Sequence, residues 1–228
     1  MQNLLVTVAI VLGLLSDCTA QVARPPEALA QATEGISEPF YRQAIERHQP
    51  VYRVDPVRSL LVIEVRRGGA LAGLAHDHVV ASHDVQGYVA PEAGRADLEI
   101  QLDRLIVDEP SLRAEAGFTT QLSEGDIAGI RKHMLEKVLE ADRYPSALVN
   151  VARDGAQWKV SITLHGTTHA LEVPLAIDTS ADEISASGHL ALRQTDFGIV
   201  PYSFLGGAIQ VQDELQLRFA IRAHRLAN

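Results

Sequence analysis

Two stretches near the C-terminal end of the chain constrain its fold most, because apolar and polar side chains alternate along them. The first spans residues 184–193 and the second spans residues 209–222. Successive side chains of a β-strand point to opposite faces, so each stretch predicts a strand with one apolar and one solvated face. Asp213 interrupts the apolar side of the second stretch, which predicts a bulge or the start of a strand there.

The segment between these two strands, residues 195–207, contains several glycines together with large apolar side chains such as Phe197 and Leu205. A loop of this composition would be poorly soluble if it lay free in water. We therefore expect it to fold over the end of an apolar interior.

The middle of the chain repeats the strand pattern in shorter stretches, separated by turn signals such as residues 91–94. Eight or nine short antiparallel strands predict an all-β fold, and they favour a closed barrel over an open sheet. The stretches expected as strands are 52–55, 59–67, 79–89, 96–107, 147–151, 158–164 and 171–177, in addition to the two above.

One helix interrupts these strands. Ser123 and Asp126 have the spacing of a capping box, which predicts a helix start. Apolar residues then recur at helical spacing, and Pro145 follows the end of the pattern. We expect the apolar stripe to pack on the core; its members are Ile127, Ile130, Met134, Leu135, Val138 and Leu139.

The N-terminal residues show a different hydropathy pattern from the predicted strands. Residues 4–15 are almost all apolar but too few to span a bilayer comfortably, and small residues precede Gln21. These features predict a signal peptide over residues 1–20, and hence a periplasmic or secreted protein whose mature form lacks cysteine. The alternative is a lipoprotein acylated at Cys18, the only cysteine.

Between the signal peptide and the strands, residues 21–50 are expected to form a linker. Within it, Ser37 could cap a short helix that runs to Glu46, with Pro39 in the first turn. Pro50 is the predicted boundary, and residues 51–226 form the predicted β-barrel domain. The net charge of −9 argues against nucleic acid or an anionic membrane surface as a partner.

Several motifs, taken in their order along the chain, resemble the YceI-like family of exported lipid-binding proteins. The resemblance implies an eight-stranded, extended, lipocalin-like barrel whose lumen holds a polyisoprenoid or a similar amphiphile. The segments that carry it are Tyr52-Arg-Val-Asp55 with Ser59, Gly87, 131–134 leading into 139–147, Leu164-His-Gly-Thr-Thr-His169 and Asp196-Phe-Gly198.

Strand alternation and the aromatic content of the late loop suggest which side chains would line such a lumen. An eight-stranded barrel is just wide enough for packed side chains or one ligand. The predicted lining residues are Val62, Leu71, Leu74, Ile100, Phe118, Met134, Leu190, Phe197 and Leu205.

Two histidines stand apart from the family-like segments. His76 and His78 are two residues apart, so on a strand both side chains would share a face and could bind one divalent metal. His189 or Asp77 is the third ligand that we would expect. The alternative is a polar turn at the mouth of the barrel.

No sequence pattern for catalysis is evident. The chain has no Gly-x-Ser-x-Gly motif and no glycine loop that would cradle a phosphate. Asp77 and Ser82 lie close to the two histidines in sequence, but neighbouring side chains on a strand point apart. We therefore expect a binding protein and not an enzyme.

Three hypotheses of function follow. The first is an exported barrel that carries an isoprenoid, a quinone lipid or another apolar amphiphile. The second is a metal- or haem-associated protein that uses His76 and His78, and the third is an interaction domain whose barrel is filled by its own side chains. Besides the apolar ligand, the expected partners are a second copy of the chain and, transiently, membrane proteins.

Overall fold

The computed structural model describes residues 35–155, 157–173 and 175–227. All of these residues belong to one compact unit. The predicted signal peptide, its cleavage site and Cys18 lie outside the described residues. Within the described part of the chain, no helix is long and apolar enough to cross a membrane.

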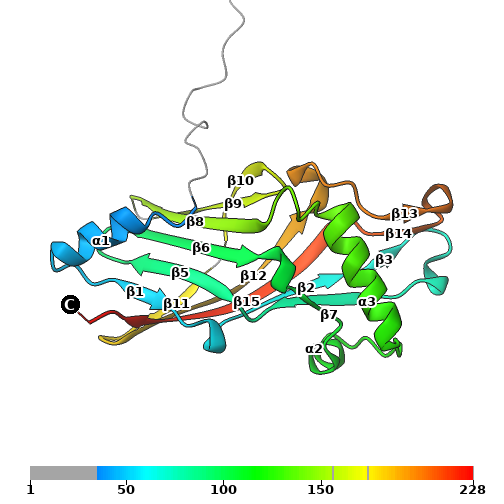
Figure 1. Ribbon diagram of the computed structural model, residues 1–228, viewed down its shortest axis with the longest axis horizontal. Helices are drawn as coiled ribbons and strands as arrows, with labels where there is room; N and C mark the ends of the chain where they lie inside the picture. The colour runs from blue at the N-terminus through cyan, green and yellow to red at the C-terminus, as the bar shows by residue number, and fades with distance from the viewer. Residues whose placement is uncertain (1–34, 156, 174, 228) are drawn as a thin grey trace, which may run out of the picture. The chain divides into compact units, whose positions relative to one another are not determined.

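The described strands form one large antiparallel sheet and one small one (Figure 1). The small sheet consists of β3 (Arg67–Gly68), β13 (Ser203–Phe204) and β14 (Ile209–Val211). The twelve strands of the large sheet are β1 (Tyr52–Val54), β2 (Leu60–Val65), β4 (His78–Ser82), β5 (Val85–Ala90), β6 (Arg95–Gln101), β7 (Ile106–Val107), β8 (Ser146–Asp154), β9 (Gln157–Leu164), β10 (Thr167–Leu171), β11 (Ala176–Thr179), β12 (Glu183–Arg193) and β15 (Glu214–Arg225).

Residues 209–211, the start of the second long alternating stretch, form β14 of the small sheet. Strand β12 is the first stretch and β15 is the rest of the second, and the two strands pair along the full length of β12. Strand β15 begins at Glu214, directly after Asp213, as predicted. Its other edge pairs with β2 over Gln216–Ala220 and with β1 over Ala223–Arg225. β15 therefore joins the two halves of the sheet.

The mainly antiparallel β fold is as predicted, but the closed eight-stranded barrel is not evident from strand pairing. Among the described residues, the pairing leaves β7, β10 and β11 as edges. The described strands also outnumber the expected ones, because five of the predicted stretches each contain parts of two strands and β13 was not predicted. The predicted strand 79–89 divides at His83 and Asp84, and the strand 96–107 divides at a 3₁₀ turn, Leu102–Arg104.

The inserted helix, α3 (Glu124–His133), begins as predicted. The Ser123 hydroxyl accepts a hydrogen bond from the Asp126 amide, and the Asp126 carboxylate accepts one from the Ser123 amide, each at 3.2 Å. A turn of π-helix, Met134–Val138, continues it. The whole predicted apolar stripe packs on the core. Helix α2 (Pro110–Glu115) was not predicted.

Helix α1 (Glu38–Glu46), which the sequence analysis placed in a linker, packs against the large sheet. Tyr41 and Ala44 are buried there beside Val51 and Ala90. Ser37 precedes the helix as expected, although its side chain makes no capping hydrogen bond. The helix therefore belongs to the same compact unit as the strands.

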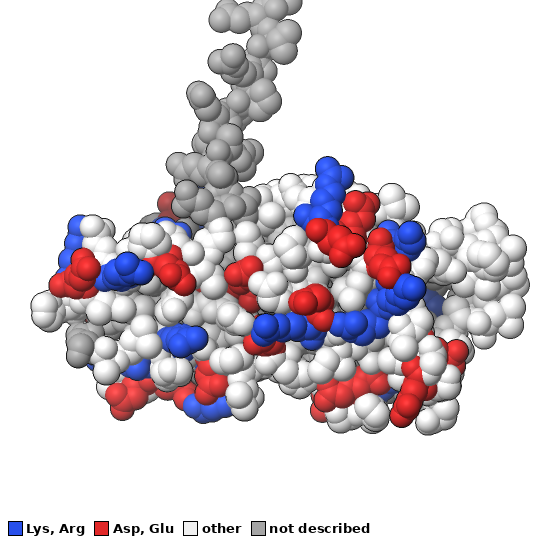
Figure 2. All heavy atoms as spheres, viewed as in Figure 1, with Lys and Arg blue, Asp and Glu red and all other residues white. Residues whose placement is uncertain are grey.

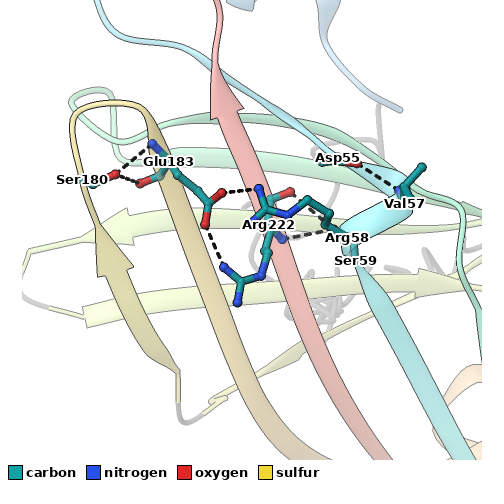
Figure 3. Close-up of polar contacts among 7 residues, drawn as sticks. All are labelled: Asp55, Val57, Arg58, Ser59, Ser180, Glu183 and Arg222. Atoms are coloured by element: carbon teal, nitrogen blue, oxygen red, sulfur yellow. Dashed lines mark hydrogen bonds and ion pairs between the residues drawn. The ribbon is translucent and has the colours of Figure 1, made fainter.

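A network of hydrogen bonds and ion pairs at the surface connects the turn between β1 and β2 to β15 and β12 (Figure 3). The Asp55 carboxylate accepts a hydrogen bond from the Val57 amide at 3.0 Å and so caps the 3₁₀ turn Pro56–Arg58. Glu183 of β12 pairs with Arg58 and, at 2.8 Å, with Arg222 of β15. The network ties the entry of β2 to the long central strand.

Candidate ligand-binding cavity

The large sheet borders a cavity of about 670 Å³. The wall includes side chains from β9, which lies on one side of β15 in the sheet, and from β12, which pairs with the other edge of β15, so the sheet curves around the space. Helix α3 and its π-turn contribute Ile130, Met134 and Val138. The loop after β12 contributes Phe197 and Ile199, both fully buried.

The described lining is almost entirely apolar. Strand alternation explains this, because one face of each strand points into the cavity. On β2, for example, Leu61, Ile63 and Val65 line it. Besides Tyr202 and Trp158, the lining residues whose side chains carry polar groups are His78, Arg95, His133, Thr179, Arg193 and Gln194.

Four residues predicted from the sequence to line a lumen do line this cavity. They are Ile100, Met134, Leu190 and Phe197. Whether these side chains contact a ligand stays a prediction.

Val62 and Phe118 lie elsewhere. Val62 is buried, but on the opposite face of β2 from Leu61 and Ile63. It packs with Leu112 of α2, and Phe118 packs against the same cluster. The prediction for Val62 was wrong because the unpredicted helix α2 makes the outer face of β2 apolar as well.

The other three predicted lining residues, Leu71, Leu74 and Leu205, are exposed to 43%, 72% and 62%. They lie in two segments that contain no charged residue, 68–75 and 197–211. A hydrogen bond of 2.8 Å from the Leu71 amide to the Ala208 carbonyl joins these segments. The exposed apolar tip that they form includes Leu71, Leu74, Val200, Tyr202, Phe204 and Leu205.

Figure 2 shows the surface over β3, β13 and β14, at the right, almost free of charged side chains on this face. The segment 197–211 both lines the cavity and forms part of the tip. The late loop therefore covers the end of the apolar interior with its first residues and exposes its later ones.

Polar side chains gather at the end of the cavity next to this tip. His78 pairs with Val65 across β4 and β2, and the Val211 amide bonds the Tyr202 carbonyl at 2.9 Å. The ring of Tyr202 lies edge-on to that of His133, with 5.1 Å between centroids. His78, His133 and Tyr202 all line the cavity.

His78 is held by a carboxylate that solvent does not reach. Its Nδ1 lies 2.7 Å from Oδ2 of Asp108, whose side chain is 0% exposed. Asp108 Oδ1 accepts hydrogen bonds from the Val79 amide at 3.1 Å and from Arg113 at 2.6 Å. Burial alone would raise the pKa of Asp108, but its bonds to His78, Val79 and Arg113 lower it below its ordinary value.

Arg113 of α2 is itself buried and completes this network. Its guanidinium donates to the carbonyls of Asp77 at 2.7 Å and Thr120 at 2.8 Å, in addition to Asp108. Every bond in the network leads to the backbone or to a second charged group. The position of the His78 ring is thus set by the scaffold behind it.

The two predicted metal ligands do not share a strand face. β4 begins at His78, so His76 precedes the strand, and the two rings lie 6.5 Å apart between centroids. Asp77 accepts a hydrogen bond from the Arg67 amide, and His189 is exposed on β12 opposite Arg218. Among the described residues, no group of three side chains suited to a metal occurs.

The opposite end of the cavity lies near the C-terminal end of β15. Trp158 lines it there, on β9 opposite Arg153 of β8. Arg95 also lines this end, but its guanidinium is bound by the buried Asp97 at 2.8 Å and stacks on Phe40. This end therefore offers an aromatic surface and a neutralised cation.

Sequence reasoning missed the residues that fix the polar end. Asp108 and Arg113 are five apart but belong to the end of β7 and to α2, and no motif marks them. The lining residues Leu61 and Ile63 could have been found, because they alternate with Val62 on the same strand. Choosing between the two faces required knowledge of what covers each.

Comparisons with known proteins show a family match and a similar fold. The pattern of the YceI-like domain family matches residues 52–223. A polyisoprenoid binding domain from Saccharophagus degradans superposes with a TM-score of 0.55 at 16% identity, covering 76% of this chain and 97% of that one. BcnA from Burkholderia cenocepacia gives a TM-score of 0.49 at 16% identity, covering 74% and 98%. The curated proteins yield no match.

Proposed function

The chain belongs to the YceI-like domain family, and from this premise we propose that its cavity holds an isoprenoid, a quinone lipid or another apolar amphiphile. The family match confirms the resemblance seen in the sequence. A structural relative is described as a polyisoprenoid binding domain, which supports the same class of ligand. The proposed role is binding and transport, without catalysis.

The observation that carries the proposal is the cavity itself. Its volume of about 670 Å³ lies within the range of roughly 300–1,000 Å³ usual for small-molecule sites. Burying hydrocarbon there would contribute about 0.8 kcal/mol per methylene group. Side chains of β9 and β12 face the same space, and we propose that the sheet closes around the ligand as an eight-stranded lipocalin-like barrel.

Organic extraction of the natively purified protein, followed by mass spectrometry, tests the proposal. We expect a co-purifying lipid at near one mole per mole of protein. Leu190→Asp would place a carboxylate in the cavity and should abolish lipid retention, because burying an unpaired charge is costly. Val57→Asp is the matched control, since Val57 is 90% exposed. Equal lipid content in both folded variants would contradict the proposal.

Export through a cleaved signal peptide is part of the same proposal. A carrier for an apolar molecule is needed where that molecule must cross water. N-terminal sequencing of protein from its native host should find a mature chain that begins at or near Gln21. An acylated Cys18 at the mature N-terminus would indicate a membrane-anchored lipoprotein instead.

The exposed apolar tip supports the expected contacts with a second copy of the chain or with membrane proteins. Exposed clusters of large apolar side chains commonly mark interaction sites. If the tip forms a homodimer, light scattering should show a dimer that Phe204→Ser converts to a monomer. If the protein is a monomer both before and after the substitution, the tip would contact a membrane protein transiently. Crosslinking in the native membrane fraction tests this interpretation.

The alternative hypothesis of a metal or haem site now rests on His76 and His78 alone. Titration with zinc or copper would show saturable binding if the pair is a site, and changing either histidine to alanine should remove it. A protein that retains neither lipid nor metal would instead be an interaction domain filled by its own side chains.

A further inference from the structure

The polar side chains that line the cavity differ in whether their hydrogen-bonding atoms are already engaged. Arg193 is bound by Asp196 at 2.9 Å, and Arg95 is bound by Asp97 at 2.8 Å. The side-chain amide of Gln194 donates to the Gln212 carbonyl at 2.9 Å. None of these three groups depends on a ligand for its partner.

His133, Thr179 and Tyr202 also line the cavity, but they are exposed to solvent. His78 differs from all of these residues because it is largely buried and only one of its two ring nitrogens is engaged. Nδ1 lies 2.7 Å from Asp108, while Nε2 has no hydrogen-bond partner among the described residues. The side chain is 17% exposed and lines the cavity, on the same face of β4 as Val80. An unpaired ring nitrogen in an apolar enclosure is costly unless a ligand or a water supplies the partner.

The partners of Asp108 determine which hydrogen bond Nε2 can make. Oδ1 of Asp108 accepts hydrogen bonds from the Val79 amide and from Arg113, and the ion pair with Arg113 keeps the carboxylate ionised, so Oδ2 carries no proton. It must then accept from His78 as well, and Nδ1 carries the proton. In the neutral ring Nε2 is consequently an acceptor, which pairs with a hydroxyl group and not with a carbonyl or an ether oxygen.

We propose that His78 accepts a hydrogen bond from a hydroxyl group at the head of the ligand, so that an isoprenoid or long-chain alcohol or a phenol lies with its head at the His78 end and its tail toward Trp158. This inference rests on the proposed function and adds the chemistry of the head and the direction of the ligand. Asp108 and Arg113 act as positioning residues behind the histidine. His133 and Tyr202 stand beside the head.

The direction follows from the arrangement of the strands. His78 pairs with Val65 near the start of β15, whereas Trp158 lies near its end, beyond Arg95 and Arg153. Between the two ends the lining is aliphatic, including Ile63, Ile100 and Ile162. An amphiphile in this cavity gains most when its polar atom lies at the end with an unpaired acceptor and its hydrocarbon lies along the rest.

Three ligands with one and the same isoprenoid chain test the proposal: the alcohol, its methyl ether and the corresponding hydrocarbon. Their dissociation constants can be compared by competition against a fluorescent polyene. The ether keeps the oxygen but lacks the proton that His78 would accept. We expect the wild-type protein to bind the alcohol about tenfold more tightly than the ether, which corresponds to one buried hydrogen bond.

His78→Leu should lower the affinity for the alcohol to that for the ether and leave the ether unchanged. The matched control is His83→Leu, since His83 is an exposed histidine bonded to Glu109 outside the cavity. It should preserve the tenfold preference.

Equal wild-type affinities for the alcohol and the ether would overturn the head-group inference while leaving the proposed function intact. If the His78→Leu variant still bound the alcohol more tightly than the ether, the head-group inference would likewise fail and the proposed function would stand. If the wild-type protein bound none of the three ligands, the proposed function would fail, and the inference with it. The wild-type comparison needs no variant, so the test stands even where His78→Leu does not fold.

Discussion

Asp97 and Asp108 are two almost fully buried acidic residues, exposed to 1% and 2% as whole residues, and each forms an ion pair with an arginine. Asp97 lies on β6 beneath α1 and bonds Arg95 and Asn150. Burial raises the pKa of Tyr41 above the ordinary value for a tyrosine, and the charge of Asp97 raises it further. All of these partners belong to the scaffold, so Asp97 holds α1 and β8 to the sheet.

Asp108 is buried to a similar degree, but its hydrogen bonds reach a side chain of the cavity wall. One oxygen is bonded to Val79 and Arg113, and the other is bonded to a side chain that lines the cavity. The scaffold on one side therefore fixes a polar group on the other. The comparison teaches that burial and ion pairing alone do not distinguish a structural carboxylate from a positioning one. What distinguishes them is where the last group in the network points.

The largest expected effect on stability is that of Arg113→Met. Arg113 is 8% exposed and Asp108 is 0% exposed, so the variant leaves a carboxylate without its cation in a place that water does not reach. We expect a loss of about 3–5 kcal/mol in the free energy of unfolding, measured with urea. Arg42→Met on the exposed face of α1 is the control and should change little. A loss below about 1 kcal/mol would mean that Asp108 is not stabilised by this pair.

Arg95→Met tests the other carboxylate and should cost less, about 2 kcal/mol. Arg95 is 33% exposed, and Asp97 keeps its hydrogen bond from Asn150 at 3.0 Å. The same urea titration measures it. If Arg95→Met were as destabilising as Arg113→Met, the two carboxylates would not differ in the way proposed.

Asn150→Ala removes the other side-chain donor to Asp97 and should cost about 1 kcal/mol, since Arg95 stays in place. Combining it with Arg95→Met should cost more than the two single changes together, because the carboxylate then loses both side-chain donors. Strict additivity in this cycle would show that the two donors act independently.

Much of the fold could be predicted from the sequence, and the reason is strand alternation. β12 and β15 were expected from their period of two, and α3 from its capping box and apolar stripe. These patterns are local, so they need no knowledge of distant residues. The signal peptide stays a prediction, since it lies outside the described residues.

The parts that could not be predicted depend on contacts between distant elements. Val62 looks like a lining residue until α2 is known to cover the outer face of β2. Leu71 and Leu205 are apolar residues in glycine-containing loops, and nothing in their spacing shows that they stay exposed. His78 and Asp108 are 30 residues apart, and only the pairing of β4 with β7 brings them together.

Glu183 extends the comparison to a carboxylate at the surface and gives the smallest expected effect. Hydrogen bonds from Arg58 and Arg222 hold its pKa below the ordinary value (Figure 3). Because the pKa of Glu183 is lower in the folded protein, its ionised carboxylate stabilises the fold at pH values above the unfolded-state pKa of about 4.3. This stabilisation is lost as the pH falls through the folded-state pKa. The difference in stability between the wild-type protein and Glu183→Gln should therefore shrink from pH 6 to pH 3. A difference that grew on acidification would contradict this assignment.

The most direct test of the account uses Trp158, the only tryptophan of the chain, which lines the cavity at the end away from His78. Long-chain alcohols brominated either at the tail or next to the hydroxyl group would be titrated against its fluorescence, which bromine quenches on contact. We predict saturable quenching that is strong for the tail-brominated alcohol and weak for the head-brominated one. Stronger quenching by the head-brominated alcohol would reverse the direction of the ligand. The absence of saturable quenching by either would contradict the claim that the cavity holds an amphiphile.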